Sequence, residues 1–88
     1  MLKEKLEKNL EDFLQKNNRP HYKDSISYSG LRKMNSSDGF SRMLHIVNFT
    51  VSISDQTYDG DALYFATFDE VEHNLVEIVG PQSYEKIS

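Results

Sequence analysis

The clearest pattern in the chain is an alternation of apolar and polar side chains between His45 and Ile53. The apolar side chains occupy every second position and the polar ones lie between them: Phe49, Val51 and Ile53 against Asn48, Thr50 and Ser52. Successive side chains of a β-strand point to opposite faces of the sheet, and β-branched and aromatic residues favour strands. The pattern therefore predicts a half-buried antiparallel strand from about Met43 to Ser54, with one face against an apolar layer.

Two segments near the ends of the chain have their apolar residues at the spacing of an amphipathic helix. The first is Leu2–Lys16 and the second is Phe68–Val79. Their apolar stripes consist of Leu2, Leu6, Leu10, Phe13 and Leu14, and of Phe68, Val71, Leu75, Ile78 and Val79. Thr67 and Glu70 form a capping-box pattern, and Gly80-Pro81 is typical of a helix end. The sequence therefore predicts two helices that can cover one face of a sheet.

Two further strands are predicted on either side of the central one. Tyr22–Ser29 alternates weakly, and a polar loop over Leu31–Ser41 leads from it into the central strand. A short turn over residues 55–57 leads on toward Ala62–Thr67, which reads A-L-Y-F-A-T and is apolar on both faces. Such a strand either lies under structure on both sides or presents an apolar edge to a partner.

The order helix, three antiparallel strands, helix predicts an α+β domain over residues 1–81, followed by a flexible tail over residues 82–88. In this α-β-β-β-α fold both helices pack on one face of a three-stranded antiparallel sheet. The residues expected to share its core are Phe13, Phe49, Val51, Val71, Leu75 and Ile78. With 88 residues, of which 38% are hydrophobic, the core is small and no large enclosed pocket is expected.

The charges are divided unevenly along the chain. Residues 1–42 contain nine Lys and Arg against six Asp and Glu, whereas residues 43–88 contain one against eight. The two halves therefore carry +3 and −7, so an anionic ligand would be attracted to the first half and repelled by the second. There is no cysteine, which excludes disulfides and thiolate metal sites. No apolar run approaches the roughly 18 residues of a membrane span, and we expect an intracellular location, in the cytoplasm or nucleus.

No group of residues has the pattern of a catalytic or metal site. His21 and His73 have no partner at metal-ligand spacing. The acidic residues between 59 and 70 fit turns and helix capping better than the spaced loop of a calcium site. No serine lies in a nucleophile elbow. We therefore expect a protein that is not an enzyme, with no cofactor, no metal, no membrane contact and no small-molecule substrate.

Several short motifs resemble the double-stranded-RNA-binding domain family, and their spacing is most similar to that of the plant Dicer-partner proteins. They cover about residues 5–80 and lie at Leu10–Lys16 (L-E-D-F-L-Q-K), Arg19–Tyr22 (R-P-H-Y), His45 with Phe49 four residues later, Tyr58-Asp59-Gly60, and Val71–Val79 (V-E-H-N-L-V-E-I-V). The α-β-β-β-α order predicted above is also the order of this family. The resemblance implies a module of an RNA-processing or RNA-silencing protein.

The resemblance also implies three regions that contact RNA. The first helix would contribute Asp12, Gln15 and Lys16. A loop before the central strand would contribute His45, together with the basic residues Arg32, Lys33 and Arg42. A lone histidine at a strand entry can equally be a simple edge residue. The third region, a lysine cluster at the start of the last helix, is replaced here by Ala66–Glu70, which presents carboxylates to phosphates.

Two functions are compatible with the sequence. The first is a module with a degenerate RNA-binding surface that acts mainly by protein–protein association, as a homodimer or docked to a partner. The second is a genuine but weak binder of double-stranded RNA that uses the first helix, the His45 loop and the basic loop over residues 31–42. The first is favoured because RNA binding does not explain the four consecutive apolar residues Ala62, Leu63, Tyr64 and Phe65.

Overall fold

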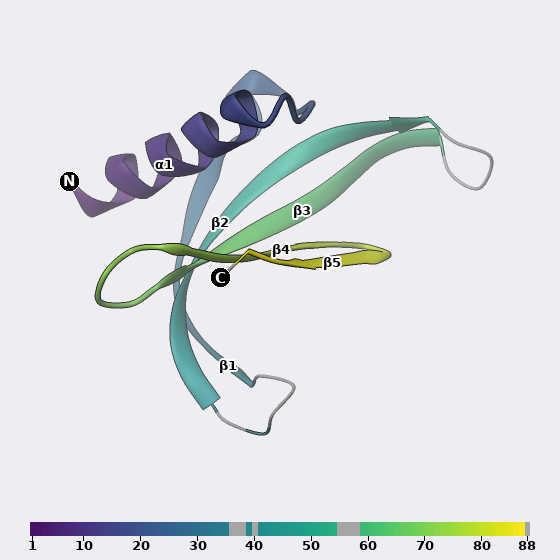
Figure 1. Cartoon of the computed structure of the whole chain (residues 1–88). Coiled ribbons are helices and arrows are strands. Elements are labelled where there is room, and N and C mark those ends of the chain that lie inside the picture. The colour runs from purple at the N-terminus through teal and green to yellow at the C-terminus, as the bar shows by residue number, and fades with distance from the viewer. Residues whose placement is uncertain (36–38, 40, 55–58, 88) are drawn as a thin grey trace.

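The structure is a computed structural model, and it describes residues 1–35, 39, 41–54 and 59–87. The described chain begins with α1 (Leu2–Lys16), continues through a short 3₁₀ helix η1 (Lys23–Ser25), and then forms five strands. The strands are β1 (Ser27–Asn35), β2 (Ser41–Ser54), β3 (Asp59–Asp69), β4 (Leu75–Gly80) and β5 (Ser83–Lys86). Each strand pairs antiparallel with the next, in the order β1-β2-β3-β4-β5, and α1 crosses one face of the resulting sheet (Figure 1).

The helix α1 has the bounds that the apolar spacing predicts. Leu6, Leu10 and Leu14 lie on one side of it and are fully buried against the sheet. The helix ends where the Asn17 side chain donates a hydrogen bond to the Phe13 carbonyl oxygen at 2.8 Å. Asn18 then adopts a left-handed backbone conformation, with φ at 53°, and turns the chain toward the sheet. The first predicted helix is therefore confirmed.

The central strand is also confirmed, and its register places the core. Along β2 and β3 the pairing runs without a shift, so Val47 lies opposite Ala66 and Phe49 opposite Tyr64. The side chains of this set point toward α1, and we call that side of the sheet its inner face. The core consists of Leu6, Leu10, Leu14, Val47, Phe49, Ala66, Phe68 and Ile78. Of the residues predicted to share the core, Phe13, Val51 and Leu75 pack against it, and Phe49 and Ile78 lie within it.

The predicted first strand is displaced along the chain, and the predicted third strand is not an edge. Residues 23–25 form η1, and β1 continues to Asn35, through the first part of the segment predicted as a loop. The Ala62–Thr67 segment lies in the middle of β3, which pairs with β2 on one side and β4 on the other. The prediction of an open edge is therefore wrong for residues 65–67, whereas residues 62–64 pair, among the described strands, with β2 only. The turns expected at 36–38 and 55–57 lie outside the described residues.

The predicted second helix is wrong, and with it the α-β-β-β-α fold. Phe68 and Asp69 complete β3, the next residues turn, and Leu75–Gly80 forms β4. Thr67 lies inside a strand, so it does not cap a helix. Val71 was predicted to lie in the core, but it stands on the turn with 80% of its surface exposed. The chain is therefore one helix on a five-stranded antiparallel sheet in the part that the structure describes.

Residues 83–87, predicted as part of a flexible tail, belong to the sheet. Tyr84 pairs with Val79 in the β4–β5 hairpin, and the Ile87 N–H donates to the Val76 carbonyl oxygen at 2.8 Å. Glu85 forms an ion pair of 2.7 Å with Arg19, just beyond the end of α1. The end of the described chain thus helps to hold α1 against the sheet, and no second helix is needed to close the core.

Candidate functional site

The hollow that the described residues form is open to solvent, and these residues form no cluster of metal ligands. An open, charged depression lies between α1 and η1, lined by Glu7, Lys8, Glu11, Lys23, Asp24 and Ile26. Within the described ranges there is no group of three or more His, Asp or Glu side chains that could hold a metal ion. The surface of the sheet is the candidate functional site.

The face of the sheet that points away from α1, which we call the outer face, carries a group of apolar side chains. Strict alternation along β2 and β3 sends Ile46, Leu63 and Phe65 to this face, because their neighbours Val47 and Ala66 point inward. Val79 lies opposite Phe65 on β4, and Tyr84 lies opposite Val79 on β5. We call the group the outer patch: Ile46, Leu63, Phe65, Val79 and Tyr84.

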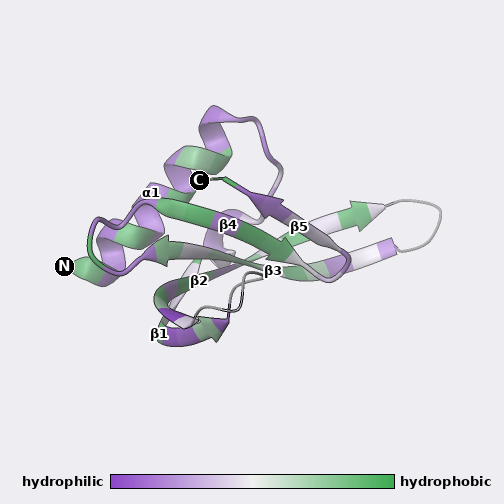
Figure 2. Cartoon of the chain, turned by 60° about the horizontal axis from the view of Figure 1, so that its bottom comes forward, coloured by the Kyte–Doolittle hydropathy of each residue, from purple (hydrophilic) through white to green (hydrophobic). Residues whose placement is uncertain are grey.

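The outer patch is contiguous and accessible. Leu63 is 62% exposed and Tyr84 is 64% exposed, and the other three side chains are half-buried. The register Asn48–Phe65–Val79–Tyr84 makes one row across four strands, and Leu63 lies two residues before Phe65 on the same face of β3. Figure 2 shows that β4 is apolar along much of its length. Apolar side chains that form a contiguous group, and are not scattered singly, are typical of an interaction surface.

Tyr84 is held over this face by a carboxylate. Its hydroxyl is hydrogen-bonded to Glu77, and this bond raises the pKa of Tyr84 above its ordinary value of 10.0, with further contributions from burial and from the negative charge of Glu77. Glu77 pairs with Thr67 and Lys86 across the sheet, so it points to the same outer face.

One buried group on the outer face has no hydrogen-bond partner. Thr67 is fully buried between the neighbouring strands, and its hydroxyl meets no donor or acceptor among the residues that the structure describes. Leaving such a group unsatisfied costs about 1–3 kcal/mol. Packing against the neighbouring strands, and not a hydrogen bond, therefore holds the Thr67 side chain in place beside the outer patch.

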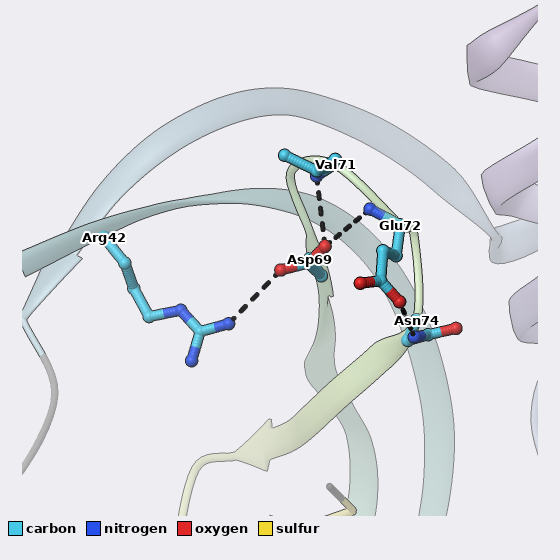
Figure 3. Close-up of polar contacts among 5 residues, drawn as sticks. All are labelled: Arg42, Asp69, Val71, Glu72 and Asn74. Carbon is cyan, nitrogen blue, oxygen red and sulfur yellow. Dashed lines mark hydrogen bonds and ion pairs between the residues drawn. The ribbon is translucent and has the colours of Figure 1, made fainter.

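The β3–β4 turn beside this face is built on one aspartate (Figure 3). The Asp69 carboxylate accepts hydrogen bonds from the backbone N–H groups of Val71 at 3.1 Å and Glu72 at 2.6 Å. The Arg42 guanidinium lies 3.6 Å from its other oxygen. The Glu72 hydrogen bond is the largest cause that lowers the pKa of Asp69 below 3.8, and Val71, Arg42 and His73 act in the same direction against a smaller effect of burial.

This geometry predicts an acid-dependent contribution to stability from Asp69. A carboxyl whose pKa is lowered in the folded state stabilises it above the unfolded value of 3.8, and this contribution is lost as the pH falls through the folded pKa. We expect the free energy of unfolding, measured with urea, to fall more steeply below about pH 4 for the native chain than for Asp69→Asn. Glu70→Gln, beside it on the same turn, is the matched control, and its free energy of unfolding should depend on pH as that of the native chain does. Equal slopes for all three proteins would contradict this role of Asp69.

His45 belongs to a polar cluster that joins α1 to the sheet. It is 5% exposed, and its Nδ1 lies 2.9 Å from the Tyr28 hydroxyl. The His73 ring packs edge-on against the His45 ring with centroids 5.5 Å apart, and the Lys5 ammonium lies 3.4 Å from His73 Nδ1. The Glu7 carboxylate accepts the Tyr28 N–H at 2.8 Å. These contacts link the helix to β1, β2 and the β3–β4 turn, which is a structural role.

The structure does not bring the residues implied by the RNA-binding resemblance together. Asp12, Gln15 and Lys16 are exposed near the end of α1, whereas Arg32, Lys33 and Arg42 lie toward the opposite end of the β1–β2 hairpin (Figure 1). His45 lies within β2 and is almost fully buried, not on a loop. The last helix, on which the third RNA contact would depend, is absent from the described chain. The predicted RNA-binding residues thus share no single surface.

The predicted protein-interface residues divide between the two faces of the sheet. Ala62 and Tyr64 point inward, and Leu63 and Phe65 point outward. The sequence pattern pointed to β3 alone, and Ile46, Val79 and Tyr84 gave no signal of their own. Those three are brought beside Leu63 and Phe65 only by the pairing of β3 with β2 and β4 and of β4 with β5.

Comparison with protein families, with curated proteins and with solved structures found no match for this chain. Among the described residues, no helix is both long enough and apolar enough to span a membrane. We therefore infer the function from the geometry of the outer face.

Proposed function

We propose that this chain is a non-catalytic protein-association module that binds its partner through the outer patch. The observation that carries the proposal is Leu63, which is 62% exposed on the middle strand β3 and lies on the same face as half-buried Phe65. An exposed leucine on a central strand, surrounded by further apolar side chains, is better explained by a partner than by the fold.

The charges around the outer patch also favour a protein over a nucleic acid. Glu77 lies on the same face, and Asp61 lies next to Leu63 on that face of β3. Carboxylates beside the patch would repel phosphates, since duplex RNA is bound mainly through its backbone charges. Weak duplex binding through Arg32, Lys33 and Arg42 stays a prediction, and a mobility-shift assay at moderate salt tests it.

The experiment compares two lysine substitutions of exposed apolar residues. Leu63→Lys places a charge in the centre of the outer patch, whereas Val71→Lys places one on the β3–β4 turn, where 80% of the residue is already exposed. We expect the native chain and Val71→Lys to associate equally, either with themselves or with a captured protein, and Leu63→Lys to lose at least about tenfold in affinity. Sedimentation and immobilised-bait binding measure this. Identical behaviour of all three proteins would overturn the proposal.

A further inference from the structure

We propose that the partner of the outer patch is a second copy of this chain, packed face to face so that the strands of the two sheets run in opposite directions. This inference rests on the proposed function and adds the identity of the partner. It comes from the distribution of charge along the outer face, which is positive at one end and negative at the other.

The basic end lies where β1 and β2 approach the β1–β2 hairpin. Arg32 pairs with Leu44, and both side chains point to the outer face, as does that of Arg42 two residues before Leu44. Arg32 is exposed, and no ion pair involving it is found among the described residues. Arg42 and Asp69 are 3.6 Å apart and balance each other, so Arg32 leaves this end with a net positive charge.

The acidic end lies where β2 and β3 approach their own connection. Asp59 pairs with Ser54 and Asp61 with Ser52, and both carboxylates belong to the outer face of β3 and are exposed. The Tyr22 hydroxyl donates a hydrogen bond to the Asp61 carboxylate at 2.7 Å. Between Asp61 and Asp69 the strand rises about 27 Å, at about 3.4 Å per residue, and Leu63 and Phe65 lie along this length.

A two-fold axis that lies in the interface and runs across the strands makes this face complementary to itself. Such an axis reverses the strand direction, so the basic end of one copy lies over the acidic end of the other, and the same pairing occurs a second time. The apolar middle, with Leu63 and Phe65, then meets its own counterpart. Two sheets packed face to face bury side chains from both, as in a β-sandwich.

The two outermost strands, β1 and β5, are less suited to a second copy than the outer face. On β1 the Tyr28 N–H is already bonded to the Glu7 carboxylate at 2.8 Å. The other edge, β5, has only four residues, all of them exposed, and two carry charges. A short, charged edge is the usual protection against strand addition. The inner face is covered by α1, which leaves the outer face as the broad apolar surface of the described chain.

A charge exchange between Arg32 and Asp59 tests the arrangement. Both residues are exposed, and neither has an ion pair among the described residues, so their substitution leaves the fold intact. In Arg32→Glu and in Asp59→Lys, each attractive contact between copies becomes repulsive, and we expect each variant alone to self-associate about tenfold more weakly than the native chain. Mixing the two variants restores attraction at both ends, so the mixture should form heterodimers with close to native affinity.

Sedimentation velocity at micromolar concentration and low salt, with far-UV circular dichroism to confirm folding, measures these outcomes. Variants that dimerise as well as the native chain, or a mixture that associates no better than the variants alone, would overturn the inference. A native chain that stays monomeric but captures another protein in a Leu63-dependent manner overturns the proposal that the partner is a second copy, and it leaves the proposed function standing. A native chain that shows neither behaviour overturns both.

Discussion

Replacement of Phe49 by alanine is expected to lower the free energy of unfolding by about 3–5 kcal/mol. Phe49 is 2% exposed at the centre of the core, and its ring packs against the Tyr64 ring with centroids 5.6 Å apart. The loss combines the transfer free energy of the ring with the cavity left behind, since the strands on either side of β2 cannot close the gap. It is a large fraction of the 5–15 kcal/mol that stabilises a typical domain.

Urea unfolding monitored by circular dichroism measures the change, and Val71→Ala is the control. Val71 is 80% exposed on the β3–β4 turn, so its truncation should change the stability by less than about 0.5 kcal/mol. In a fold with a second helix over residues 68–79, Val71 would lie in the core and both substitutions would destabilise the protein. Comparable losses for Phe49→Ala and Val71→Ala would therefore contradict the five-stranded sheet.

The second large effect is expected for Leu10→Ala, with a loss of about 2–5 kcal/mol. Leu10 is fully buried at the middle of α1, between Leu6 and Leu14, which are also fully buried. α1 is the helix that covers the inner face of the sheet in the described chain, so a cavity beneath it removes contacts from both layers. The ion pair between Arg19 and Glu85 and the bond from Tyr28 to Glu7 lie at the margins and do not replace this packing.

Thermal unfolding of Leu10→Ala beside Lys3→Ala tests the role of the helix. Lys3 lies on the exposed side of α1, so its replacement keeps the helix and removes no core contact. We expect the melting temperature to fall markedly for Leu10→Ala and to change little for Lys3→Ala. Equal melting curves would mean that α1 does not cover the inner face.

The elements with a long and regular pattern were predictable from the sequence. α1 repeats Leu6, Leu10 and Leu14 at helical spacing, and β2 alternates strictly from Val47 to Ile53, so each pattern fits one kind of element. The segment from Phe68 to Val79 fits both kinds. Its apolar residues match a helical stripe, but L-V-E-I-V is equally a short strand rich in β-branched residues.

Contacts within the folded chain decide between a helix and a strand for this segment. Asp69 binds the N–H groups of Val71 and Glu72 and closes a turn, and His73 adopts a left-handed conformation with φ at 63°. Neither feature continues a helix. The pairing of β4 with both β3 and β5 then satisfies its backbone groups. Thr67 and Glu70 resembled a capping box only because residue types, and not hydrogen bonds, are visible in a sequence.

The outer patch was predictable in part for the same reason. The apolar run over residues 62–65 indicated a surface that needs a partner, and the alternation of a strand places Leu63 and Phe65 on one side. Ile46 and Val79 carry no local signal, because each looks like an ordinary core residue of its own strand. Only the register across four strands shows that they lie beside Phe65 on the face away from α1.

Amide chemical shifts recorded while the native chain is diluted from millimolar to micromolar concentration report most directly on whether the outer patch binds a second copy of this chain. We expect concentration-dependent shifts at Ile46, Leu63, Phe65 and Val79, none at the exposed positions of α1, and no dependence on concentration in Leu63→Lys. Shifts that map to α1, or a concentration dependence that survives Leu63→Lys, would contradict the assignment of this face.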